Sequence, residues 1–200
     1  MKTLQGKHIR LRAIELTDLD FLYQIENDES FWSISNTQKP FSKFLLQQYL
    51  ENSHLDIYEA KQLRLIIFQN KTNTPVGMID LFDFEPKHKR AGLGLLIHPA
   101  FENRGYATEA IQLITAYAFT HLDMHQIFAN ITTDNKKSIA LFKKLNFQRA
   151  GEKKDWIYAN GTYKNEVLYQ LIHETSMLNL YPLREIEDST PPLKTINKES

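Results

Sequence analysis

The segment HPAFENRGYATEA, which spans His98–Ala110, has the residue types of a turn that binds an anion through its backbone. It follows an apolar run and opens a helical pattern, and the first N–H groups of a helix lack partners within the helix and attract negative charge. Gly105 and Ala107 present almost no side-chain bulk to a ligand. Asn103 tolerates a positive φ angle, and Arg104 adds a cation. The stretch predicts a phosphate or pyrophosphate site; the alternative is a tight turn that uses glycine for packing.

A second polar cluster follows the next predicted strand and opens another helical pattern. Asp134 is the predicted N-cap of that helix. Asn135 and Ser138 are three residues apart, so both fall in the first turn and can hydrogen-bond a ligand between the two helix starts. The same helix carries Lys136, Lys137, Lys143 and Lys144. The alternative is a capped amphipathic helix with solvated lysines.

Carboxylates in the segment IDLFDFE are candidates for a general base. Asp80 and Asp83 differ by an odd number of positions, so an ideal strand would place them on opposite faces, with Glu85 on the face of Asp83. Each of them also fits an exposed carboxylate at a strand end. His98 follows the strand predicted over residues 91–97 and is expected to cap a turn; the alternative is that it serves as a base or a contact.

Composition narrows the classes of function. The chain has 200 residues, of which 42% are hydrophobic, enough for one domain with a core. Its 24 basic and 24 acidic residues balance, so no basic excess points to nucleic acid. The absence of cysteine excludes a thiol nucleophile, and His121 and His125 have no evident third ligand, so no metal site is expected. Without a secretory apolar core or a run of about 20 apolar residues, we expect a cytoplasmic protein with no membrane partner.

The elements that must position these residues follow from periodicity. Strand patterns cover residues 8–13, 63–69, 76–84, 91–97, 126–132, 147–159 and 163–173, and helix patterns follow residue 17 and cover 41–55, 105–121 and 134–145. Residues 31–40 are predicted to be irregular. Asn160-Gly161 predicts a tight hairpin. Hairpins around a central β-α-β-α-β unit predict a single mixed α/β (α+β) domain over residues 1–182 and a polar tail, 183–200.

The first polar cluster resembles the pyrophosphate motif of the GNAT superfamily of acetyl-CoA-dependent N-acetyltransferases. That motif is Gln/Arg-x-x-Gly-x-Gly/Ala, and Gly105 and Ala107 match its last two fixed positions. Glu102 stands at the Gln/Arg position, which is a departure. Many members have glycine where this chain has Asn103.

The second cluster resembles the family's later signature, Asn-x-x-Ser followed by a helix that ends in Leu-Gly-Phe. Asn135 and Ser138 match its start, and Leu145-Asn146-Phe147 matches its end with asparagine in place of glycine. Both Gly-to-Asn departures keep a left-handed backbone accessible, which supports the predicted turns.

The resemblance covers roughly residues 7–173 and implies a single-domain GNAT-type fold, with a mixed, mostly antiparallel central sheet flanked by helices. It implies that acetyl-CoA is the cosubstrate and that the thioester lies in a V between strands 91–97 and 126–132. The backbone N–H of Leu96 or Ile97 would then polarise the thioester carbonyl. The residues implied at the cofactor are Leu95, Leu96, Ile97, Glu102, Asn103, Arg104, Gly105, Tyr106, Ala107, Thr108, Asn135, Ser138 and Phe142.

The resemblance leaves gaps among the catalytic and acceptor-binding residues. Many members of the family carry, where this chain has Phe142, a tyrosine that acts as the general acid. Phe142 cannot donate a proton, and we expect it to pack against the cofactor instead. Asp83 is the candidate base. Polyamine enzymes of the family carry an acidic pair just before a proline. The corresponding proline in this chain is Pro40, and Thr37-Gln38-Lys39 precede it. The candidate acceptor residues are Glu26, Asp28, Glu29, Trp32 and Asp80, with Phe31 as a further wall.

Within the superfamily, the chain is similar to the branch of spermidine/diamine and ribosomal-protein N-terminal acetyltransferases, because Asn160-Gly161-x-Tyr163-x-Asn165 is similar to the closing hairpin of the polyamine enzymes. The predicted function is acetyl transfer to a primary amine by direct attack on the thioester. The acceptor stays open between a polyamine-like small molecule and a protein N-terminal amine, and homo-oligomer formation stays open too. The alternative function is a CoA-binding module with little or no catalysis.

Overall fold

The computed structural model describes residues 2–35, 37–53, 55–159 and 161–173 and is built on one mixed sheet. Its seven strands run in the order β1-β2-β3-β4-β5-β7-β6, and β4 and β5 form the parallel pair among antiparallel ones. The strands are β1 (Ile9–Ala13), β2 (Leu63–Gln69), β3 (Thr74–Glu85), β4 (Arg90–Ile97), β5 (Gln126–Thr132), β6 (Gln148–Ala159) and β7 (Thr162–Ile172). This confirms the predicted fold class. The predicted tail, 183–200, lies outside the described residues.

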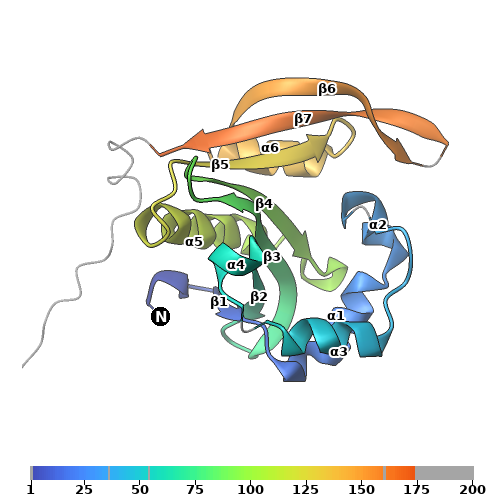
Figure 1. Cartoon of the computed structure of the whole chain (residues 1–200), viewed down its shortest axis with the longest axis vertical. Helices are drawn as coiled ribbons and strands as arrows, with labels where there is room; N and C mark the ends of the chain where they lie inside the picture. The colour runs from blue at the N-terminus through green and yellow to red at the C-terminus, as the bar shows by residue number, and fades with distance from the viewer. Residues whose placement is uncertain (1, 36, 54, 160, 174–200) are drawn as a thin grey trace, which may run out of the picture.

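Helices flank the sheet, and none of those described is long and apolar enough to cross a membrane. The α-helices are α1 (Leu19–Glu26), α2 (Glu29–Ser35), α3 (Lys43–Glu51), α4 (Ile57–Ala60), α5 (Tyr106–Thr120) and α6 (Lys136–Lys144). Short 3-10 turns are η1 (Lys2–Leu4), η2 (Leu16–Asp18) and η3 (Pro99–Phe101). Figure 1 shows α1 and α3 lying together, while β6 and β7 form a long arm that reaches over α2.

The sheet is buried on both faces around β2, which explains why that strand is a continuous apolar run. Leu65 and Ile67 point into the large core that includes α5. Ile66 and Phe68 point to the other face, where α1 and α3 cover them. The alternation of side chains along the strand therefore divides one apolar run between two cores.

The starts of two helices differ from the sequence prediction. Helix α2 extends into the stretch 31–40 that was predicted to be irregular. The Asp28 carboxylate accepts a hydrogen bond from the Ser30 N–H (3.0 Å) and starts the helix. The N-cap of α6 is Asn135 and not Asp134, since the Asn135 side chain accepts from the Ser138 N–H (3.1 Å). The Asp134 carboxylate instead pairs with Lys164.

Candidate active site

A cleft opens in the sheet because β4 and β5 pair only briefly and then separate. Residues 90–92 face 126–128, whereas the two strands continue to Ile97 and Thr132. Beyond that point β4 stays paired with β3 and β5 stays paired with β7. A cavity of about 700 Å³ lies in the opening, with Leu95, Leu96 and Ile97 on one wall and Thr132 on the other. The splayed strand pair expected from the family resemblance is therefore present.

The ladder between β3 and β4 decides which backbone N–H groups of β4 face the opening. The His98 N–H donates to the Val76 carbonyl on β3 (2.9 Å), and the register places Leu96 opposite Met78. In an antiparallel ladder, alternate residues direct their N–H groups to the same neighbour. The N–H of Leu96 is thus turned to β3, which corrects its expected role as a donor. The N–H groups of Ile97 and Leu95 are directed to the open side.

The turn before α5 has the backbone predicted for an anion site. Asn103 has φ 59° and Gly105 has φ 81°, so both occupy the left-handed region. Gly105 is the N-cap of α5, and no side chain caps that helix start. Ala107 and Thr108, in the first turn, line the cleft. Unpaired N–H groups beside small side chains suit a phosphate.

Two residues of this turn direct their side chains elsewhere. The Arg104 guanidinium donates to the Ala100 carbonyl (3.0 Å) and lies over the Phe101 ring, and it is absent from the cleft wall. The expectation that Arg104 supplies the cation at a bound phosphate is therefore corrected. The Tyr106 ring is buried, and its hydroxyl accepts a hydrogen bond from Gln69 (2.7 Å).

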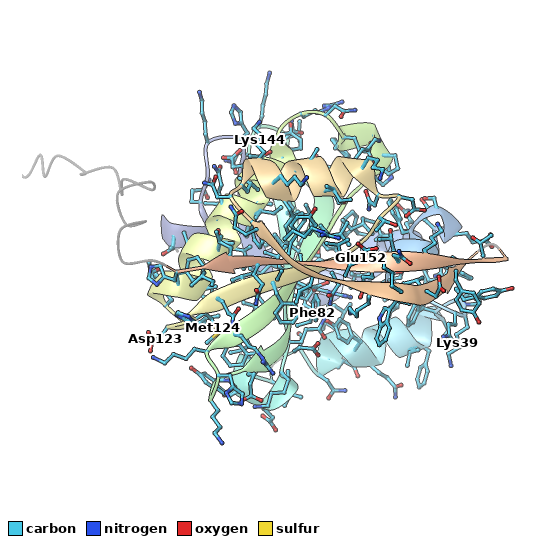
Figure 2. The ribbon with its side chains drawn as sticks, turned by 90° about the horizontal axis from the view of Figure 1, so that it is seen from above. Lys39, Phe82, Asp123, Met124, Lys144 and Glu152 are labelled. Carbon is cyan, nitrogen blue, oxygen red and sulfur yellow. The ribbon has the colours of Figure 1, made fainter. Side chains whose placement is uncertain are left out.

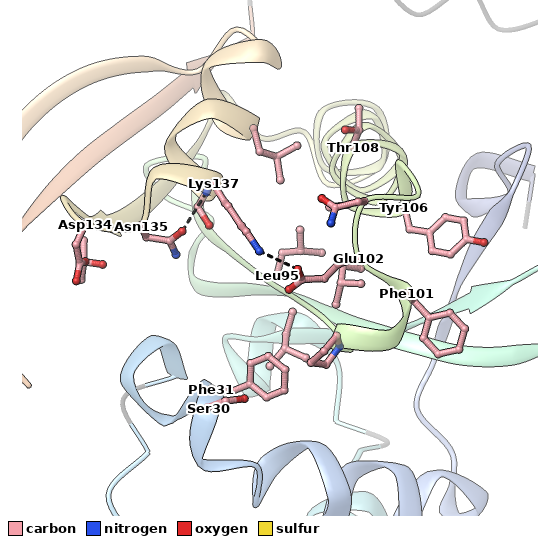
Figure 3. Close-up of a pocket in the computed structure, with 18 of the residues that line it drawn as sticks. Ser30, Phe31, Leu95, Phe101, Glu102, Tyr106, Thr108, Asp134, Asn135 and Lys137 are labelled. Atoms are coloured by element: carbon pink, nitrogen blue, oxygen red, sulfur yellow. Dashed lines mark hydrogen bonds and ion pairs between the residues drawn. The ribbon is translucent and has the colours of Figure 1, made fainter. Parts of the chain in front are cut away.

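Helix α6 forms the facing wall of the cleft. Asn135 and Ser138 both line the cleft, and the Asn135 amide keeps its N–H groups after capping the helix. The Lys137 ammonium reaches across to the Glu102 carboxylate (2.9 Å), as the dashed line in Figure 3 shows. One ion pair therefore connects the starts of α5 and α6 over the cleft.

Phe142 does not occupy the cleft wall. It is 5% exposed and packs edge-to-face on Phe147, with ring centroids 4.9 Å apart. Leu141, its neighbour, lines the cleft instead. The predicted contact of Phe142 with the cofactor is thus replaced by a role in the core beneath it.

Two segments that the sequence analysis did not predict to lie together line the far end of the cleft. Phe31 on α2 and Ile157, Ala159 and Lys164 on the arm of β6 and β7 line the same cavity. Lys164 also pairs with Asp134, and its hydrogen bond lowers the pKa of that carboxyl. The Asn-Gly turn predicted the hairpin, but no local signal indicated that it covers the cleft.

Two of the expected acceptor carboxylates are bound to an arginine that the sequence analysis missed. Arg64 donates from Nε to Asp80 Oδ1 (2.7 Å) and from Nη1 to Glu26 Oε1 (2.7 Å). Its guanidinium lies 5.6 Å from the Tyr49 ring centroid. Burial raises the pKa of the Tyr49 hydroxyl. A charged residue inside the apolar run LRLIIF was the available signal.

The other expected acceptor residues have mainly local partners. Asp28 caps α2, and hydrogen bonds from Ser30 lower the pKa of its carboxyl. The Trp32 indole N–H donates to the Glu26 carbonyl (3.0 Å) and so fixes the α1–α2 connection. Glu29 is exposed in the first turn of α2.

Asp83, the candidate base, lies in a different hollow. A bulge between Phe82 and Glu85 breaks the regular alternation, and Asp83 is exposed with φ 47°. It lines a second cavity, with Glu85 and Arg90, at the end of β4 where β4 and β5 are paired. The structure therefore separates Asp83 from the open end of the cleft and gives no support for it as the base. His98 caps η3, as predicted, through its ring nitrogen.

Comparison with known proteins also indicates an acetyltransferase. The sequence matches the model of the acetyltransferase (GNAT) domain over residues 8–148. Spermidine N(1)-acetyltransferase of Escherichia coli (strain K12) is 26% identical over 162 residues, which cover 80% of this chain and 83% of that protein. The uncharacterized N-acetyltransferase YoaA of Bacillus subtilis (strain 168) is 32% identical over 173 residues, covering 84% and 96%.

A solved structure has the same fold. Spermidine N-acetyltransferase from Vibrio cholerae, in complex with CoA and spermine, has a TM-score of 0.76 at 23% identity, over 84% of this chain and 96% of that one. A dodecameric structure of that Vibrio cholerae enzyme has a TM-score of 0.72 at 24% identity, over 88% and 98%. These similarities show that the fold is shared.

Proposed function

This chain belongs to the acetyltransferase (GNAT) family, and from that premise we propose that its cleft binds acetyl-CoA and acetylates a primary amine. The observation that carries the proposal is the separation of β4 from β5 beside the uncapped start of α5. Such an opening exposes strand N–H groups to a thioester and helix N–H groups to a pyrophosphate within one cavity.

The cleft residues fit the cofactor in chemical type. The turn 103–108 offers backbone donors for a pyrophosphate, and Asn135 and Ser138 offer side-chain donors for an amide-rich arm. The N–H groups of Leu95 and Ile97 are free to bind along β4. When bound, acetyl-CoA supplies an activated acetyl group as a thioester.

Catalysis then depends on orientation and on the backbone. The N–H of Ile97, aimed at the open side of β4, stabilises negative charge on a carbonyl oxygen held beside it. The walls from α2 and from the arm of β6 and β7 hold the acceptor next to that carbonyl, so proximity supplies much of the rate. With Asp83 in another hollow, we propose that the acceptor ammonium loses its proton to solvent.

For the acceptor, we propose a small polyamine-like amine in preference to a protein N-terminal amine. The support is the similarity to spermidine acetyltransferases. The group of Glu26, Arg64 and Asp80 contains two carboxylates and one guanidinium. None of the three lines the cleft, so its net charge of one negative unit attracts an ammonium from outside the cleft wall. Glu29 adds an exposed carboxylate on α2.

The test is turnover of acetyl-CoA against a panel of amines: spermidine, a diamine, a simple alkylamine and a short peptide with a free N-terminus. We expect release of free CoA with spermidine at a higher kcat/KM than with the peptide. Binding of CoA without turnover of any amine would leave only the alternative of a CoA-binding module. A preference for the peptide would replace the proposed acceptor.

We also propose that the chain forms a homo-oligomer, because the similar Vibrio cholerae enzyme has a dodecameric structure. Light scattering coupled to size-exclusion chromatography measures this directly. A mass equal to one chain of 23.4 kDa at micromolar concentration would overturn it.

A further inference from the structure

Glu102 places a carboxylate where the proposed cofactor site must accept an anionic pyrophosphate. It ends η3, lines the cleft and is 38% exposed. The corresponding position in the resembled motif is glutamine or arginine. A negative charge beside two phosphates weakens their binding unless a cation neutralises it.

Lys137 is the cation that reaches this point. Its ammonium lies 2.9 Å from Glu102 Oε2, although its backbone belongs to the first turn of α6 on the opposite wall. The side chain is 81% exposed, so its ammonium is free to exchange partners without leaving a buried site. In Figure 3 the pair spans the gap between the two helix starts.

Other described cations near the cleft have partners that hold them elsewhere. The Arg104 guanidinium donates to the Ala100 carbonyl. The Lys136 ammonium donates to the Thr133 carbonyl (2.6 Å), and Lys164 pairs with Asp134 on the arm side. Within the described residues, Lys137 is thus the cleft-lining cation that stands between the starts of α5 and α6.

We propose that the Lys137 ammonium binds the pyrophosphate beside the backbone N–H groups of the turn 103–108, and that Glu102 holds the ammonium in place until the cofactor arrives. On binding, the Lys137 ammonium exchanges the Glu102 carboxylate for a pyrophosphate oxygen. The exchange is feasible because exposed ion pairs contribute little to stability, while a hydrogen bond from an ammonium to a phosphate is charge-assisted. This inference rests on the proposed binding of acetyl-CoA in the same cleft.

Calorimetric titration with CoA and with pantetheine, which lacks the phosphates, tests the exchange. Lys137→Met is expected to weaken CoA binding at least about tenfold, the loss of one charge-assisted hydrogen bond, and to leave pantetheine binding unchanged. Glu102→Gln is expected to tighten CoA binding about threefold or more, because it removes competition for Lys137 and a like charge. Lys137→Arg should retain most of the affinity for CoA.

Lys144→Met is the matched control, because it removes the same charge from the last turn of α6 (Figure 2), and Lys144 does not line the cleft. Its affinity for CoA should match that of the parent chain. Equal CoA affinity in the parent and in Lys137→Met, or weaker binding in Glu102→Gln, would overturn the inference while leaving the proposed function intact. Failure of the parent chain to bind CoA would overturn the proposed function itself.

Discussion

At the scale of single residues, Arg64 shows how one charge joins three elements of the fold. It interrupts the apolar run of β2 and joins Glu26 at the end of α1 to Asp80 on β3. Burial lowers the pKa of the guanidinium, but the two carboxylates outweigh burial and raise the pKa above its usual value. The positive charge therefore persists at all ordinary pH values and keeps both carboxylates paired.

Replacing Arg64 with methionine should destabilise the fold. Removing one partner of a buried ion pair leaves carboxylates unpaired and costs about 3–5 kcal/mol; because Arg64 is partly exposed, we expect about 3 kcal/mol. Urea denaturation measures the loss. Arg149→Met is the control, since Arg149 pairs with Glu152 at the surface and should cost less than about 1 kcal/mol. Equal losses in the two variants would contradict this account of Arg64.

The burial of Phe142 leads to a second prediction at this scale. Without a tyrosine acid, the CoA thiol, with a pKa near the ~8.5 of a cysteine thiol, leaves as thiolate, while an amine with a pKa near ~10 must lose its proton. We expect the rate to rise with pH. Phe142→Tyr should change kcat by less than about tenfold, or roughly 1.4 kcal/mol of barrier. Asp83→Asn should have a similarly small effect, because Asp83 lies in the second hollow.

Profiles of rate against pH for the parent and both variants, with the best amine, supply the measurement. A gain of a hundredfold in Phe142→Tyr would mean that the natural chain is catalytically impaired. A hundredfold loss in Asp83→Asn, with an unchanged circular dichroism spectrum, would restore Asp83 as the base.

At the scale of elements, the turns at helix ends keep a left-handed backbone although their residues differ from those of the resembled motifs. Asn103 and Asn146 have φ angles of 59° and 66°, so asparagine keeps the left-handed backbone at both positions where the resemblance to the family motifs led us to expect glycine. Gly105 has φ 81°, and a Cβ built on it would meet no protein atom within 4 Å. The space above Gly105 is thus open, and in our proposal the pyrophosphate occupies it.

Gly105→Val should therefore weaken CoA binding by more than about tenfold, through steric exclusion of the phosphate, while the chain still folds. Gly161→Val is the matched control: Gly161 has φ 78° and equally open surroundings, but it lies at the tip of the hairpin. Both variants carry the same backbone strain, of about 1–2 kcal/mol. Calorimetry should show lost affinity in the first variant and normal affinity in the second. Equal affinities would remove the cofactor from this turn.

At the scale of the whole molecule, the cleft is assembled from chain segments that lie far apart in sequence. Its walls come from α2, the end of β4, the first turns of α5 and α6, and the arm of β6 and β7. All of the described lining residues lie between Ser30 and Lys164.

Truncation after Pro182 should leave turnover within about twofold of the full chain, since the polar, Pro-Pro-containing composition of residues 183–200 predicts a tail that is separate from the catalytic domain. The measurement is kcat/KM of both forms under the same conditions, with size-exclusion chromatography to compare their assembly. A tenfold loss of activity would show that the removed residues complete the site, within one chain or between two.

The sequence by itself determined the strands, the main helices, the left-handed turns at Asn103 and Gly105, and the family motif. These follow from hydrophobic period and backbone preference, which act over a few residues. Tertiary structure decided which side chains meet. Asp83 lies at the end of the sheet where β4 and β5 are paired, away from the cleft. Packing buried Phe142, and sheet order brought Arg64 to Glu26 and Asp80. Such contacts depend on strand order and register, which pair residues distant in sequence and leave no local periodic signal.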